Sequence, residues 1–95
     1  MKNKNIIKVR KELDKLDNIF LKVVKKRTEL VKIILRNKKF KKDIIDKKRI
    51  KIILKNIKNK SIKKGIDPKI SNRIWKNMIY AFIDYEYRNF KNKRK

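Results

Sequence analysis

The sequence predicts an all-α protein in which one long helix is followed by two shorter ones. Its 95 residues include one Gly, one Pro and no Cys. Strands joined by tight turns and a disulfide framework are therefore both poorly supported. Charged residues make up 44% of the chain and apolar residues 40%, and the apolar residues recur at helical spacing. We expect a single domain over residues 1–95, with helices at about 6–39, 47–63 and 68–90.

The first expected helix carries an apolar stripe that no Gly or Pro interrupts. Its apolar residues recur at intervals of three, four and seven: Leu13, Leu16, Phe20, Val23, Leu30 and Ile34. From Lys8 to Lys39, about 32 residues at a rise of 1.5 Å make a rod of roughly 48 Å, whereas a globule of about 95 residues has a radius of gyration of about 13 Å. Two shorter helices cannot cover both sides of such a rod, so we expect a homodimer in which the long helices pair.

Capping residues delimit the two shorter helices. Asp46 can cap the helix over residues 47–63, and Gly65 marks its end. Asp67 followed by Pro68 has the form of an N-cap and a first-turn proline for the helix over residues 68–90. The apolar positions of the two helices include Ile50, Ile53, Leu54 and Ile57, then Ile70, Ile74, Trp75, Met78, Ile79, Phe82 and Ile83.

The formal net charge of +24 would ordinarily indicate nucleic acid or an anionic membrane as a partner. Lys, Ile and Asn are abundant, however, and all three have A/T-rich codons, so genome composition can raise the charge without any function. The basic residues are also spread around every helix instead of forming one stripe with interleaved aromatics. We therefore expect neither a membrane nor a specific nucleic acid as partner. A basic nucleic-acid-binding module, supported by the net charge and the tail Arg88–Lys95, remains a distant alternative.

The residue inventory excludes most enzyme classes. There is no His or Cys, no paired-carboxylate motif, no glycine-rich phosphate loop and no metal-ligand cluster, so we expect neither a metal nor another cofactor. The apolar runs are far shorter than the roughly 20 residues that cross a bilayer, and no secretory signal is evident. We expect a cytoplasmic protein whose candidate site consists of cations on helices, with Arg27 and Lys38 about three turns apart on one face.

These cations stand in a pattern that resembles a known family, the all-helical AroQ class, or type II, of chorismate mutases. The similarity covers roughly residues 6–90, and no single motif in it is distinctive, but their order and spacing match. The matching residues are Arg10 with Leu13-Asp14, Arg27 with Glu29-Leu30, Lys38, Asp46 with Arg49, Asp67-Pro68, Ile74-Trp75 and Glu86.

The resemblance implies an intertwined homodimeric helical bundle that converts chorismate to prephenate, a step of phenylalanine and tyrosine biosynthesis that begins from the shikimate pathway. Each of two active sites would take Arg10 from one chain and the remaining residues from the other. Arg10 and Arg27 would clamp the substrate carboxylates and Lys38 would reach the ether oxygen. The other implied site residues are Glu86 beside the ether oxygen, Arg49 as support and Asp46 near the ring hydroxyl.

The reaction explains why so few groups suffice. It is a unimolecular pericyclic rearrangement, so it requires no nucleophile and no general base. The site must hold a compact, chair-like conformer and stabilise the charge that develops at the breaking ether oxygen. The planar guanidinium of an arginine suits a carboxylate, and the compact ammonium of a lysine suits a single oxygen.

Three residues depart from the family pattern. Glu86 stands where many members have Gln, and an ionised carboxylate cannot donate a hydrogen bond, which predicts mutase activity that increases as pH falls. Ile50 and Phe82 are apolar where the family often has polar residues that contact the ring. Both fit the helical core spacing, but isochorismate-pyruvate lyases share this fold and have apolar or aromatic residues at these places. Lyase activity, which forms salicylate, is therefore the nearest alternative.

Overall fold

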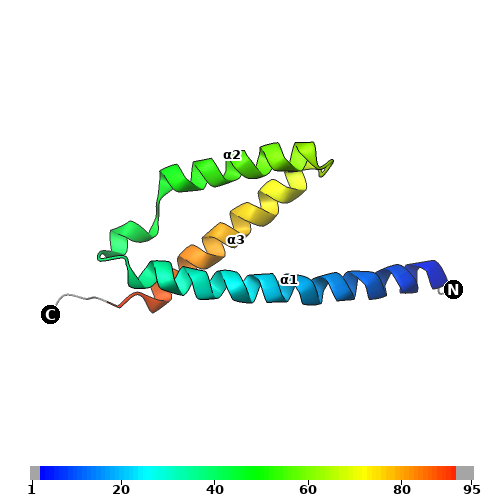
Figure 1. Cartoon of the computed structure of the whole chain (residues 1–95), viewed down its shortest axis with the longest axis horizontal. Helices are drawn as coiled ribbons and strands as arrows, with labels where there is room; N and C mark the ends of the chain where they lie inside the picture. Colours follow the sequence, from blue (N-terminus) through cyan, green and yellow to red (C-terminus); the bar gives the residue numbers. More distant parts are fainter. Residues whose placement is uncertain (1–2, 92–95) are drawn as a thin grey trace. The chain divides into compact units, whose positions relative to one another are not determined.

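The computed structural model describes residues 3–91, and this part of the chain is helical with no strand. Figure 1 shows the elements in order: α1 (Lys4–Arg36), the short 3₁₀ helix η1 (Lys41–Ile44), α2 (Lys47–Lys63) and α3 (Pro68–Asn89). The predicted all-α fold with one long and two shorter helices is thereby confirmed. Residues 92–95 of the predicted basic tail lie outside the described range. No helix among the described residues is long and apolar enough to span a membrane.

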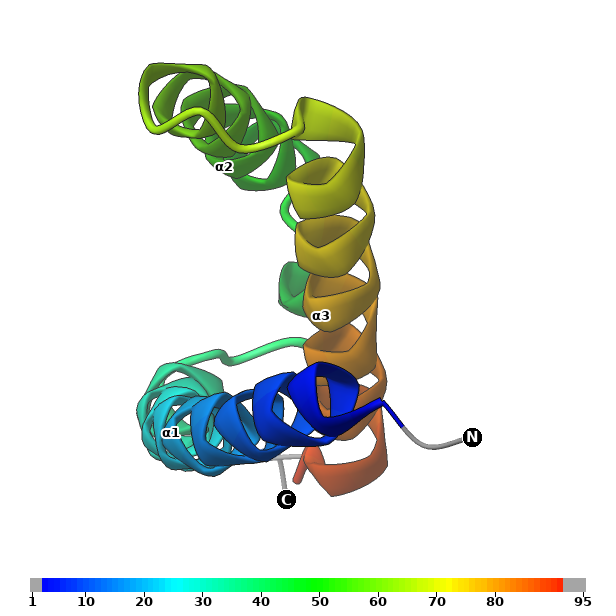
Figure 2. The same cartoon turned by 90° about the vertical axis from the view of Figure 1, so that its right-hand side faces the viewer.

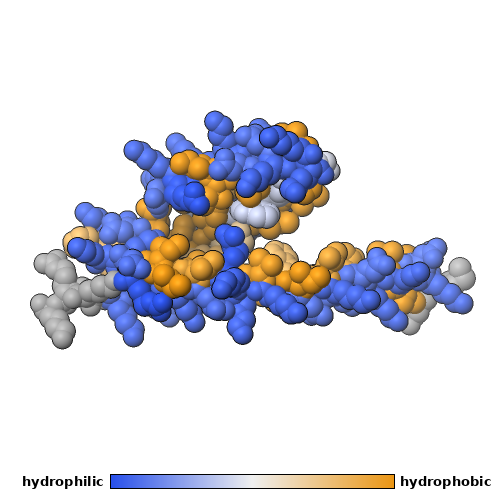
Figure 3. All heavy atoms as spheres, in the orientation of Figure 1, coloured by the Kyte–Doolittle hydropathy of each residue, from blue (hydrophilic) through white to orange (hydrophobic). Residues whose placement is uncertain are grey.

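The chain divides into two compact units, of which the first ends at Val31 and the second begins at Lys32. In the described residues the first unit consists of α1 up to Val31, a single helix. Its apolar side chains are largely exposed, at 52% for Leu13, 59% for Leu16 and 48% for Phe20. Figure 3 shows such apolar side chains gathered along α1. A lone helix has no second element on which to bury this face.

The long helix ends at Arg36, earlier than the predicted end near residue 39. The backbone amides of Asn37 and Lys38 donate to the carbonyls of Ile34 and Leu35, at 3.0 and 3.1 Å. These are bonds of the 3₁₀ type, which tighten the last turn of a helix and stop its propagation. The Asn37 side chain also donates to the Ile33 carbonyl at 2.8 Å. Lys38 therefore lies in the link beyond α1.

The turn between α2 and α3 is a Schellman motif built on Gly65. Its φ of 72° lies in the left-handed region that glycine enters at little cost. The Gly65 amide donates to the Ile62 carbonyl at 3.2 Å, and the Ile66 amide donates to the Ser61 carbonyl at 2.8 Å. Asp67 then caps α3 by accepting from the Lys69 amide at 2.9 Å. Figures 1 and 2 show α2 and α3 joined at this turn and spreading apart toward their other ends.

Two buried hydroxyl groups join α2 to α3 near this turn. The Oγ atoms of Ser61 and Ser71 lie 2.6 Å apart, and Ser61 Oγ also donates to the Ile57 carbonyl at 2.6 Å. The two serines are 4% and 5% exposed. Ser71 Oγ also lies 3.4 Å from the Pro68 carbonyl. A hydroxyl has one proton, and the Ser61–Ile57 bond is the shorter of the two bonds to a carbonyl, which favours Ser71 as the donor between the two serines.

Candidate active site

The centre of the candidate site is an ion pair between the link after α1 and the C-terminal part of α3. Lys38 Nζ donates to Glu86 Oε1 at 2.8 Å and to the Ile44 carbonyl at 3.2 Å. The side chains of Lys38 and Glu86 are 19% and 9% exposed. The structure thus brings together the two residues predicted to be catalytic.

The fold positions this pair through η1. Ile44, the last residue of η1, is 3% exposed and is the most buried apolar residue described. Phe40 donates its amide to the Asp43 carboxylate at 3.2 Å, which holds the start of η1. With Ile44 anchored, its carbonyl is a fixed acceptor for the Lys38 ammonium. Charged hydrogen bonds of this kind are stronger than neutral ones, and a pair removed from water needs such additional partners to offset its desolvation.

Asp46 and Arg49 lie together at the start of α2. Asp46 is the N-cap, and its Oδ1 accepts from the Arg49 backbone amide at 3.0 Å. This is the capping role that the sequence indicates for Asp46. The Arg49 side chain is exposed, and within the described residues no ion pair joins it to Asp46. Its guanidinium is therefore not tied to the cap.

Ile50 on α2 and Phe82 on α3 are both half-buried. Phe82 precedes Glu86 by four residues, so the two share a face of α3. Ile50 follows Arg49 directly in the first turns of α2. Both residues thus have apolar surface left for a further contact.

Arg10 and Arg27 lie on the part of α1 that forms the first unit. Arg10 is exposed, whereas Arg27 is half-buried. The Nε atom of Arg27 is shielded from solvent and has no hydrogen-bond partner among the described residues. Burying a cationic N–H group without an acceptor is costly.

The Ile44 carbonyl, which accepts from Lys38, is a feature of the site that sequence reasoning missed. A backbone acceptor leaves no signature in side-chain identity, and the short helix that presents it lies between residues 39 and 47, where no helix was expected. The described residues hold no group of three or more His, Cys, Asp or Glu side chains that could bind a metal ion.

Together, the helices and the Lys38–Glu86 site define an all-α protein with a half-buried lysine bonded to a buried acid. Comparison with known families gives this class a name. The family model for chorismate mutase type II matches residues 9–87, so the chain belongs to this family, as the sequence resemblance predicted. Neither the curated proteins nor the solved structures gave a significant match.

Proposed function

We propose that this chain is a chorismate mutase, which rearranges chorismate to prephenate without a cofactor. The observation that carries the proposal is the Lys38–Glu86 pair, with Nζ and Oε1 2.8 Å apart, in a chain of the chorismate mutase type II family. The ammonium supplies positive charge where the ether oxygen becomes negative, and the acid lies beside it. Stabilising charge that develops only in the transition state raises the rate of the chemical step.

The remaining site residues bind and orient the dicarboxylate substrate. Arg10 and Arg27 clamp its carboxylates, and the unpartnered Nε of Arg27 supports this role. Arg49 adds a third guanidinium and Asp46 lies near the ring hydroxyl. Holding both carboxylates selects the compact conformer, which lowers the entropic part of the barrier.

Ile50 and Phe82 form the apolar side of the site. Both retain exposed surface, and such a surface suits the carbon face of the substrate ring. A wall without polar groups also excludes water from the breaking bond, which strengthens the electrostatic interactions around it.

The active unit is a homodimer, in which Arg10 reaches the site of the partner chain. The exposed apolar face of α1 supports this arrangement, since Ile6, Val9, Leu13, Leu16 and Phe20 are each about half exposed. A row of exposed apolar side chains along one helix is typical of a protein interface. Apolar residues recur along the whole of α1, so the same face of a second copy of the helix can pack against it.

An assay with two substrates, run separately, tests the proposal. Purified protein supplied with chorismate should form prephenate, at a rate that Lys38→Gln lowers by roughly 100-fold or more, because one charged contact to the transition state is lost. Lys76→Gln removes an exposed lysine of α3 and should leave the rate unchanged. Prephenate formation that survives Lys38→Gln would contradict the assigned role of Lys38.

Isochorismate-pyruvate lyase activity is the second candidate. The observation that favours it is the apolar character of Ile50 and Phe82, two half-buried residues that cannot hydrogen-bond a substrate hydroxyl. The same protein supplied with isochorismate would then release salicylate and pyruvate. Formation of these products from isochorismate, without prephenate from chorismate, would establish the lyase in place of the mutase.

A further inference from the structure

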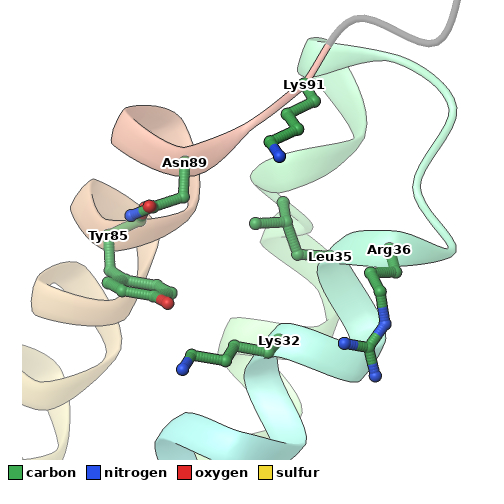
Figure 4. A pocket seen from close by; sticks show the side chains of 6 residues that line it. All are labelled: Lys32, Leu35, Arg36, Tyr85, Asn89 and Lys91. Carbon is green, nitrogen blue, oxygen red and sulfur yellow. The ribbon is translucent and has the colours of Figure 1, made fainter.

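A cavity distinct from the Lys38–Glu86 pair lies between the last turns of α1 and the C-terminal turns of α3. Its volume is about 380 Å³, within the range of small-molecule sites, which is roughly 300–1,000 Å³. All its lining residues belong to the unit that begins at Lys32. Figure 4 shows them: Lys32, Leu35, Arg36, Tyr85, Asn89 and Lys91.

Leu35 and Tyr85 form facing apolar walls of this cavity (Figure 4). Leu35 is 9% exposed and Tyr85 is half-buried, so both side chains are packed against the rest of this unit over part of their surface. On the same helix, the Arg88 guanidinium lies 5.9 Å from the centroid of the Tyr85 ring and pairs with Asp84 at 2.7 Å. An aromatic face opposite an aliphatic side chain fits a flat ring.

The remaining charge on the cavity is positive. Lys32, Arg36 and Lys91 line it, and no carboxylate does so among the described residues. The nearest acids in the sequence are engaged elsewhere, Asp84 with Arg88 and Glu86 with Lys38. In Figure 4 the ammonium groups of Lys32 and Lys91 reach toward the space between Leu35 and Tyr85. The Lys32 ammonium lies near the Tyr85 ring and the Lys91 ammonium near Leu35, at opposite ends of this space. An anion placed at either end would meet positive charge.

We infer that this cavity binds an aromatic carboxylate that carries no amino group. The ring lies between Leu35 and Tyr85, and the carboxylate lies beside Lys32 or Lys91. An aromatic amino acid is disfavoured because its ammonium group would be repelled by the same cations that attract its carboxylate. The ligand is therefore an aryl-alkanoate, and the inference does not depend on the proposed mutase activity.

A titration of the full chain with 3-phenylpropanoate, followed by amide-resolved NMR at fixed salt, tests this inference. We expect saturable binding with a dissociation constant of about 1 mM, as ligand efficiency sets for a ligand of this size, and with the largest shifts at Leu35, Tyr85 and Asn89. Three matched probes each remove one feature: 3-phenylpropanamide lacks the charge, propanoate lacks the ring, and phenylalanine adds the ammonium. Each of the three should bind at least about tenfold more weakly than 3-phenylpropanoate.

Two double variants separate a site from general attraction to a basic protein. Lys32→Gln with Lys91→Gln should weaken 3-phenylpropanoate about tenfold. Lys63→Gln with Lys76→Gln removes the same charge from exposed positions outside the cavity and should leave the affinity unchanged. Equal weakening by both pairs, equal binding of the four probes, or shifts centred on Arg49 and Ile50 would overturn the inference.

Discussion

At the scale of single residues, Glu86 faces two different demands. It accepts a hydrogen bond from Lys38 at 2.8 Å, which an ionised carboxylate does well, but it can donate to an ether oxygen only when it is protonated. The protonated form is favoured at low pH, so we expect kcat/KM to be high at low pH and to be lost as pH rises. Glu86→Gln carries a donor at every pH and should show a flat profile.

Rates measured from about pH 4 to pH 8 check this, with circular dichroism at each pH as the control for unfolding. Parallel profiles for the two proteins would contradict the assignment.

Arg27 is the cation whose loss should separate catalysis from overall charge. Its shielded Nε has no partner among the described residues, so a substrate carboxylate would satisfy a donor that is otherwise costly to bury. We expect Arg27→Ala to lower kcat/KM by roughly 100-fold, the effect of losing about two charged hydrogen bonds. Arg73→Ala removes an equal charge from an exposed position of α3 and should retain full activity.

Binding to random duplex DNA, measured in parallel, should weaken equally and slightly in both variants, because it depends on net charge. A large loss of DNA affinity in Arg27→Ala alone would support the nucleic-acid-binding alternative.

At the scale of elements, the Ser61–Ser71 contact fixes how α2 and α3 meet. Ser61 and Ser71 share one hydrogen bond between their hydroxyls, and Ser61 also donates to Ile57, so each hydroxyl depends on the other within a buried chain of bonds. Ser71→Ala should lower the free energy of unfolding by about 1 kcal/mol, and so should Ser61→Ala. The double variant should lose less than the sum, because the shared bond is counted once. Urea unfolding of the four proteins measures this coupling, and strict additivity would show that the hydroxyls act independently.

The elements themselves were predictable wherever side chains mark a helix end. Asp46 accepts from the Arg49 amide, and Asp67 with Pro68 begins α3, so both shorter helices start at residues with local capping chemistry. Gly65 likewise marks the end of α2 through its positive φ. The end of α1 was harder to predict because neither Gly nor Pro stands there, and 3₁₀ hydrogen bonds to Ile34 and Leu35 stop the helix instead. The 3₁₀ helix η1 was not predicted because its four residues are too few to show helical spacing of apolar side chains.

The candidate site was predictable only in part from sequence. Lys38 and Glu86 are 48 residues apart in sequence, and the family spacing alone suggested that they meet. The buried acceptor at the Ile44 carbonyl belongs to the backbone, so no residue type predicts it. The apolar cavity walls of Leu35 and Tyr85 fit the helical core pattern equally well, and only their placement beside three cations distinguishes them from core residues.

At the scale of the whole molecule, the small core is the main physical argument for a second chain. Leu35 and Ile44 are the only buried apolar residues among those described, which is little for a chain of 95 residues. Isolated helices are marginal in water, and most helical stability in proteins comes from packing an apolar face. The α1 face that includes Leu13, Leu16 and Phe20 needs such packing. Leu16→Glu should therefore weaken dimerisation in sedimentation experiments, whereas Lys15→Glu, at an exposed polar position next to it, should not.

Mixing of inactive variants tests whether the site is shared between chains. In the proposed dimer each site takes Arg10 from one chain and Arg27 from the other. A heterodimer of Arg10→Ala and Arg27→Ala chains would then hold one site with both substitutions and one intact site. After the two variants are unfolded together and refolded, half of the dimers are mixed, so about a quarter of the wild-type activity should return. Arg27→Ala mixed with Arg49→Ala is the matched control, because both residues belong to the same chain of a site and no intact site can form. Recovery in neither mixture would show that Arg10 acts within its own chain.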